Sequence, residues 1–171
     1  QQQLAARFLR STDAGHTWDF IGEIPYQPDT AADPEAQHRD GFTEPNIPFL
    51  TDGSILCLLR TTDGHGVGPM FASRSTDGGQ TWSTPRFFDD LGVWPALVTL
   101  DCGVTLAAYG RPGLFLRATA DPAAETWGER VDVVPPQDLQ RDTCSYSDLL
   151  AVADDEALLA FDRPAAGVDP K

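Results

Sequence analysis

Ser75-Thr76-Asp77-Gly78-Gly79-Gln80-Thr81-Trp82 is a motif that this chain repeats. Residues 11–18 carry nearly the same letters, and a third, more divergent copy with one extra residue runs from Thr119 to Trp127. The Asp of such a motif can accept hydrogen bonds from backbone N–H groups, and its Gly adopts a positive φ without steric cost. Each copy, named here the first, second or third turn repeat, therefore predicts a tight turn, and we expect its Trp to cover the hairpin with an apolar face.

Short apolar runs flank these turns, and no segment has the 3.6-residue periodicity of an amphipathic helix. Turn signals at Gly53, Gly103 and Asp155 recur about every 50 residues, which is the length of a four-stranded propeller blade. The polar segment 27–42 is long for a connection, and such loops are often functional. The predicted strands are residues 4–10, 17–24, 47–50, 54–60, 70–74, 83–88, 96–100, 104–109, 113–118, 130–134, 149–153 and 157–162.

This spacing predicts an all-β chain that covers roughly half of the blades of a propeller. Its parts are the outer strands of one blade (1–26), two whole blades (43–90 and 91–135) and the inner strands of a further blade (143–163). A half-ring would leave two sheet edges exposed, so we expect the remaining blades to lie outside these residues.

Composition narrows the class of partner. The 171 residues carry a formal net charge of −14, which argues against a nucleic-acid partner, although a local arginine cluster can still bind a small anion. No apolar run approaches the roughly 20 residues of a membrane helix, and residues 1–4 have no signal-peptide pattern. Cys57, Cys102 and Cys144 lack the spacing of a zinc site, so we expect no metal and no cofactor. One disulfide is compatible with this count, and a secreted or extracytoplasmic location is weakly favoured.

The repeat also serves to locate candidate site residues. Counting nine residues back from each of the three hairpin turns gives Glu44, Trp94 and Tyr146, while Arg60 and Arg111 end the second strand of their hairpins. Equivalent positions of successive blades lie on one rim of the central channel of a propeller. We therefore expect these five side chains to converge there.

The motifs resemble those of the sialidase (neuraminidase) superfamily. The turn repeats resemble its Asp-box, also called the BNR repeat, and residues 144–149, Cys-Ser-Tyr-Ser-Asp-Leu, are similar to its Tyr-Ser-Asp-Leu motif. The segment from Glu44 to Arg60 is similar to a family segment with a Glu before a hairpin and an Arg after it. The resemblance implies a six-bladed β-propeller in which Tyr146 is the nucleophile, Glu44 is its base partner, and Arg60 and Arg111 bind a substrate carboxylate.

The implied activity is an exo-acting glycoside hydrolase that removes a terminal sialic acid or related acidic sugar. Guanidinium groups bind a carboxylate bidentately, and a neutral phenol is not repelled by that carboxylate as an anionic nucleophile would be. Trp94 is interpreted as a sugar-stacking platform or as packing. Asp40, in the loop before Glu44, is a candidate for an additional acidic group at the rim.

Other interpretations stay open. The family's first arginine and its aspartic general acid are not found in this sequence, so a non-catalytic glycan-binding or scaffold propeller is an alternative. A hydrolase for another acidic sugar is a further one. Taken singly, Tyr146 fits a core aromatic, Arg60 and Arg111 fit solvated strand ends, and Glu44 fits a turn cap.

Overall fold

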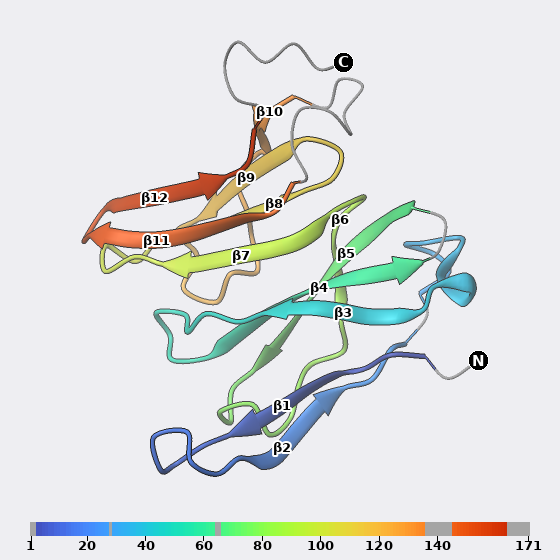
Figure 1. Cartoon of the computed structure of the whole chain (residues 1–171), viewed down its shortest axis with the longest axis horizontal. Helices are drawn as coiled ribbons and strands as arrows, with labels where there is room; N and C mark the ends of the chain where they lie inside the picture. The colour runs from blue at the N-terminus through green and yellow to red at the C-terminus, as the bar shows by residue number, and fades with distance from the viewer. Residues whose placement is uncertain (1–2, 28, 64–65, 136–144, 164–171) are drawn as a thin grey trace.

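The computed structural model describes residues 3–27, 29–63, 66–135 and 145–163, and these residues are all-β, as predicted. Their twelve strands form four antiparallel sheets with neighbours in chain order: β1–β2, β3–β6, β7–β10 and β11–β12 (Figure 1). The described residues contain one 3-10 turn, at Ala36–His38. The strands are β1 Ala6–Arg10, β2 Asp19–Ile24, β3 Gly41–Asn46, β4 Ile55–Asp63, β5 Gly66–Ser75, β6 Arg86–Asp89, β7 Val93–Thr99, β8 Thr105–Gly110, β9 Leu114–Thr119, β10 Val131–Val134, β11 Ser147–Ala153 and β12 Glu156–Phe161.

The sheets lie beside one another in sequence order (Figure 1). The first strands of the three later sheets meet, because β7 contacts both β3 and β11. The N-terminal ends of these three strands therefore come from segments roughly 50 residues apart and lie in one region. This arrangement is what places the candidate site.

One predicted strand is wrong. The run Ile47–Leu50 was expected to pair, but the strand of this hairpin is β3, which lies earlier at Gly41–Asn46. Pro48 has no N–H to give to a ladder, and only an isolated bridge between Phe49 and Ile55 forms here. Ile47 and Phe49 remain 50% and 69% exposed, while Leu50 is buried, so Leu50 is the residue of this apolar run that packs in the core.

The turn repeats form the predicted turns. Asp77 accepts the backbone N–H groups of Gln80 and Thr81 and the hydroxyls of Ser75 and Thr81, with distances of 2.6–3.1 Å. Gly79 has a φ of +92°, which an L side chain rarely adopts. The first and third repeats use Asp13 and Asp121 in the same way.

The Trp side chains of the second and third repeats join neighbouring sheets, whereas Trp18 of the first repeat is 58% exposed. The Trp82 indole N–H donates to its own turn at Gly79, but its ring stacks on Phe8 of the β1–β2 sheet at a centroid distance of 4.3 Å. Trp127 of the third repeat meets the edge of Phe88 of the β3–β6 sheet at 5.3 Å. These two Trp rings, which were expected to cover their own hairpins, therefore also connect one sheet to the preceding sheet.

These turns give a prediction about acid stability. Hydrogen bonds from the side chain and backbone of Thr81 lower the pKa of Asp77 to about 2, from a usual value near 3.8. The folded-state pKa is depressed, so the stabilisation is present above pH 4 and is lost as pH falls through about 2. In thermal melts, Asp77→Asn should therefore lower the Tm at pH 7 and should match the unsubstituted protein near pH 2. An equal Tm deficit at both pH values would show that the charge of Asp77 does not matter.

The loop between β2 and β3 is held by an ion pair. Arg39 donates to both carboxylate oxygens of Asp33 at 2.7 and 3.0 Å, and both side chains are largely buried. These hydrogen bonds from Arg39 hold the pKa of Asp33 below its usual range. The ion pair between Arg39 and Asp33, two residues of the loop itself, thus holds the loop in place.

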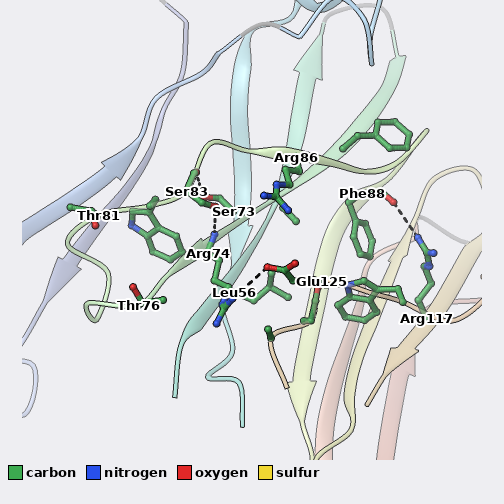
Figure 2. Close-up of a pocket in the computed structure, with 16 residues that line it drawn as sticks. Leu56, Ser73, Arg74, Thr76, Thr81, Ser83, Arg86, Phe88, Arg117 and Glu125 are labelled. Atoms are coloured by element: carbon green, nitrogen blue, oxygen red, sulfur yellow. Dashed lines mark hydrogen bonds and ion pairs between the residues drawn. The ribbon is translucent and has the colours of Figure 1, made fainter. Parts of the chain in front are cut away.

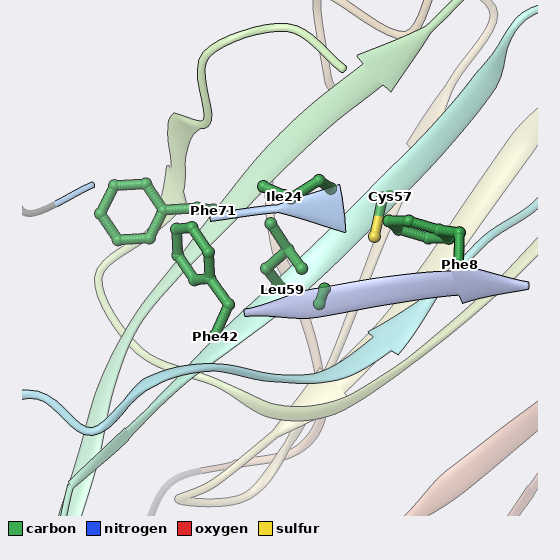
Figure 3. Close-up of a cluster of buried hydrophobic side chains, with 7 residues drawn as sticks. Phe8, Ile24, Phe42, Cys57, Leu59 and Phe71 are labelled. Carbon is green, nitrogen blue, oxygen red and sulfur yellow. The ribbon is translucent and has the colours of Figure 1, made fainter. Parts of the chain in front are cut away.

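Two of the buried clusters join the first three sheets. In the first, side chains of the β1–β2 sheet interleave with side chains of the β3–β6 sheet (Figure 3). The second joins the β3–β6 and β7–β10 sheets. Members of the first are Ala6, Phe8, Ile24, Phe42, Cys57, Leu59 and Phe71; members of the second are Leu58, Met70, Phe88, Ala107, Tyr109 and Phe115.

The cysteines that the structure describes are free. Cys57 is buried, which raises the pKa of its thiol, and Cys102 is exposed. Cys144 lies outside the described residues, so the disulfide prediction is not tested for it. Among the described residues there is no helix with the length and apolar character needed to cross a membrane.

Candidate active site

The site lies where β3, β7 and the start of β11 meet. β-Bulges interrupt the pairing of β3 between Thr43 and Asn46 and that of β7 between Val93 and Ala96. Glu44 and Trp94 stand in these bulges with φ angles of +49° and +48°. Bulges re-aim side chains, and a positive φ at a non-glycine residue is a strain that concentrates at functional sites.

Ser145, just before Tyr146, repeats this feature at the third strand with a φ of +66°. Gly110 leaves the space for it, because a Cβ at Gly110 would lie 2.2 Å from the Ser145 Cβ. The backbone before β11 is therefore packed directly on the end of β8.

Glu44 is held by two neighbours. Its Oε1 accepts a hydrogen bond from the Arg60 guanidinium at 2.7 Å, and its Oε2 accepts the backbone N–H of Trp94 at 2.7 Å. The side chains of Glu44 and Arg60 are only 19% and 15% exposed, so solvent screens this ion pair less than a surface pair. The carboxylate thus spans two sheets in a fixed orientation.

Tyr146 lies in an aromatic and cationic group. Its ring is 4.8 Å from the Trp94 ring, tilted by 37°, and the Arg111 Cζ lies 5.6 Å from its centroid. Tyr146 and Trp94 are 42% and 45% exposed, so both offer ring surface to a ligand. Among the described residues, no hydrogen bond joins the Tyr146 phenol to Glu44.

A cavity of about 400 Å³ opens between the three strands. This volume is within the range of small-molecule sites. The Ser147 hydroxyl is buried and finds no hydrogen-bond partner among the residues that the structure describes. The lining residues are Glu44, Pro45, Asn46, Trp94, Pro95, Ala96, Ser147 and Asp148.

The sequence matches the BNR repeat-like domain family over residues 1–158. The chain belongs to this family. That confirms the superfamily indicated by the turn repeats. No curated protein matches the sequence significantly.

Solved structures share the fold of this BNR repeat-like domain. A protein of unknown function from Dyadobacter fermentans is 20% identical to this chain, with a TM-score of 0.68. The match covers 93% of this chain and 42% of the Dyadobacter protein. A GH93 α-L-arabinofuranosidase of Fusarium graminearum, in complex with arabinobiose, is 17% identical to this chain, with a TM-score of 0.66. The match covers 95% of this chain and 51% of the Fusarium enzyme. The domain therefore spans about half the length of these proteins. A Hadza microbial sialidase, 21% identical, matches 67% of this chain and 29% of its own at a TM-score of 0.44, which is too low to support an argument.

The domain brings together five of the six residues singled out from the sequence. Glu44 and Trp94 line the cavity, Arg60 is tied to Glu44, and Tyr146 stacks beside Trp94 under Arg111. Asp40 is not among the lining residues; its carbonyl accepts the N–H of Leu4 at 2.7 Å, at the start of β3.

Three polar lining residues were missed by counting along the repeat. Asn46 follows the β3 bulge, and its Oδ1 accepts the Leu97 N–H at 3.1 Å, which joins β3 to β7. Ser147 and Asp148 stand in the Tyr-Ser-Asp-Leu stretch, where the signal was present but was assigned to Tyr146 alone.

The arrangement supplies a fixed carboxylate, a phenol, two guanidiniums and an aromatic face. Such groups suit proton transfer and the binding of a polar ring with hydroxyl or carboxylate groups. No group of three His, Cys, Asp or Glu side chains that could hold a metal occurs in the described part of the chain.

Proposed function

We propose that this domain is part of a six-bladed propeller glycoside hydrolase that removes a terminal sialic acid or related acidic sugar with retention. The observation that supports it best is the Glu44 carboxylate, which is oriented by Arg60 and by the Trp94 N–H, together with the exposed Tyr146 ring that contacts the Trp94 ring. The GH93 fold of the Fusarium protein, which carries a sugar ligand, is consistent with it.

In the proposed reaction the Tyr146 oxygen attacks the anomeric carbon while its proton passes to Glu44. The bond to the leaving oxygen breaks, and that oxygen takes a proton from an acid. Water then attacks the same carbon and gives a proton to the conjugate base of that acid, while the bond to Tyr146 breaks and the phenol regains its proton from Glu44. Two displacements at one carbon retain its configuration. Arg111 and Arg60 would offset the charge of the substrate carboxylate.

A second candidate is a hydrolase that acts on a neutral sugar and uses two carboxylates of the protein as its catalytic groups. Arg60 is already paired with Glu44, which leaves it less able to bind a substrate carboxylate. Asp148 lines the same cavity as Glu44, and paired carboxylates are the usual machinery of glycosidases. The arabinobiose complex of the Fusarium relative also favours this alternative.

Tyr146→Phe separates the two candidates. In the full-length protein, a fluorogenic sialoside and a fluorogenic arabinofuranoside are compared as substrates. If the Tyr nucleophile operates, kcat/KM for the sialoside falls by about 10²-fold or more, because the covalent step is lost.

Tyr26→Phe is the matched control, because its hydroxyl donates to the Ala36 carbonyl and lies outside the cavity lining. This control should keep its activity. Arabinofuranoside release that survives Tyr146→Phe but is lost in Asp148→Asn would favour the second candidate. Sugar binding without release of either substrate would contradict both.

A further inference from the structure

A second cavity, of about 600 Å³, lies between two sheets and shares no lining residue with the candidate active site. One wall comes from β5, the second turn repeat and β6, and the other comes from β9 and the third turn repeat. Figure 2 shows Arg74 and Arg86 toward one side and Arg117 with Phe88 toward the other. We name it the inter-sheet pocket; its lining includes Leu56, Arg74, Trp82, Arg86, Phe88, Arg117, Glu125 and Trp127.

The charge of this pocket opposes that of the chain. Three of the twelve basic residues line it, with Glu125 as its one acidic lining residue among those that the structure describes, although the net charge of the chain is −14. A positively charged pocket in a negatively charged chain attracts anions locally.

The three arginines are not equivalent. Arg74 forms ion pairs with Asp52 and Glu125, and Arg117 donates to the carbonyls of Phe88 and Gly128. Arg86 is exposed, and its side chain has no hydrogen bond or ion pair within the described residues. The Arg86 guanidinium is therefore available to bind a ligand, whereas the guanidiniums of Arg74 and Arg117 are already held by groups of the protein.

Aromatic surface accompanies this charge. Trp82 and Trp127, from two successive turn repeats, line opposite walls and are both only partly buried. Their indole N–H groups are bonded within their own turns, at 3.1 and 2.9 Å, which fixes the ring planes. Rigid, partly buried indoles with polar groups at their edges offer their remaining flat apolar surface to a sugar ring.

We propose that the inter-sheet pocket is a binding site for an acidic oligosaccharide, distinct from the active site. A sugar ring packs on the indole surface and its carboxylate binds Arg86. The adjoining cavity beyond Arg117 is lined by four carboxylates, those of Asp89, Asp90, Glu129 and Asp132, against the two guanidiniums of Arg117 and Arg130, so the anionic group belongs at the Arg86 end. The proposal does not rest on the catalytic chemistry above, because it uses none of the same residues.

The test uses trigalacturonate and its full methyl ester, which has the same rings without the charges. Binding to the full-length protein in the Tyr146→Phe background is measured by calorimetry. The indole N–H signals of Trp82, Trp94 and Trp127 are followed by NMR. We expect trigalacturonate to bind more tightly than the ester and to shift Trp82 and Trp127 but not Trp94. Arg86→Ala should weaken trigalacturonate binding by about 10- to 100-fold, since a hydrogen bond to a charged group is lost.

Arg7→Ala is the matched control, because Arg7 is an exposed arginine of β1 that pairs with Glu23. It should bind trigalacturonate as the parent does, and Arg86→Ala should keep the glycosidase activity. The proposal would be overturned if Arg86→Ala bound trigalacturonate as tightly as the parent protein, or if the ester bound as tightly as trigalacturonate. It would also be overturned if only the Trp94 signal shifted, or if the parent protein did not bind trigalacturonate. A failure of the proposed glycosidase activity would leave these binding results as they are.

Discussion

Glu44→Gln is expected to lower kcat/KM of the full-length protein by about 10³- to 10⁴-fold on whichever glycoside it hydrolyses. Glutamine keeps the shape and one acceptor oxygen, but it can neither accept the Tyr146 proton nor balance the Arg60 charge. Both proposed mechanisms use this carboxylate, the first as a base and the second as one of two acids. The substitution therefore tests the site rather than one choice of substrate.

The geometry explains why the effect should be large. Oε1 is tied to Arg60 and Oε2 to the Trp94 N–H, so both oxygens are oriented before substrate arrives. Glutamine would place an NH₂ group against either the guanidinium or the N–H, and both of these are donors. The side chain must then turn, and the Trp94 platform loses its fixed partner.

Glu23→Gln is the matched control, because it removes a carboxylate from an exposed pair with Arg7 at 3.3 Å. Exposed pairs contribute little, so activity and Tm should be nearly unchanged. The Glu44→Gln protein should retain a cooperative melt. If it also retained full activity on every substrate that the parent cleaves, Glu44 would have no catalytic role.

The sequence predicted those features that depend on local chemistry. The Asp of each turn repeat, with a Gly in the first two repeats, determined the turns, since the hydrogen bonds of the Asp close within seven residues, as at Asp77 and Thr81. The spacing of the hairpin turns then led to Glu44 and Trp94 on the adjoining strands β3 and β7 and to Tyr146 just before β11, because the sheets follow one another in chain order. Family membership followed from the same motifs.

What the sequence did not reveal depends on contacts between sheets. Apolar letters at Ile47–Leu50 suggested a strand, but the pairing was decided by the prolines and by the bulge at Glu44. The positive φ of Trp94 and Ser145 has no signature in residue type. The contact of Trp82 with Phe8 joins residues far apart in the chain, so counting within one hairpin could not find it.

The largest expected effect on stability is at Phe42, which is 2% exposed and lies in the cluster that joins the first two sheets (Figure 3). Its ring meets Tyr26 edge-on at 4.9 Å and Phe71 at 5.7 Å. Phe42→Ala removes these contacts and leaves a cavity at the seam, which should cost about 3–5 kcal/mol of the free energy of unfolding. Since about 1 kcal/mol shifts the Tm of a domain of this size by roughly 2–4 °C, we expect a fall of about 10 °C in calorimetry.

Phe49→Ala provides the comparison, because it deletes the same ring from a side chain that is 69% exposed. We expect it to change the free energy of unfolding by no more than about 0.5 kcal/mol. The difference between the two variants measures burial at the seam, since the chemistry of the deletion is identical. Equal Tm values for the two variants would mean that the β1–β2 sheet is not held to the β3–β6 sheet by this cluster.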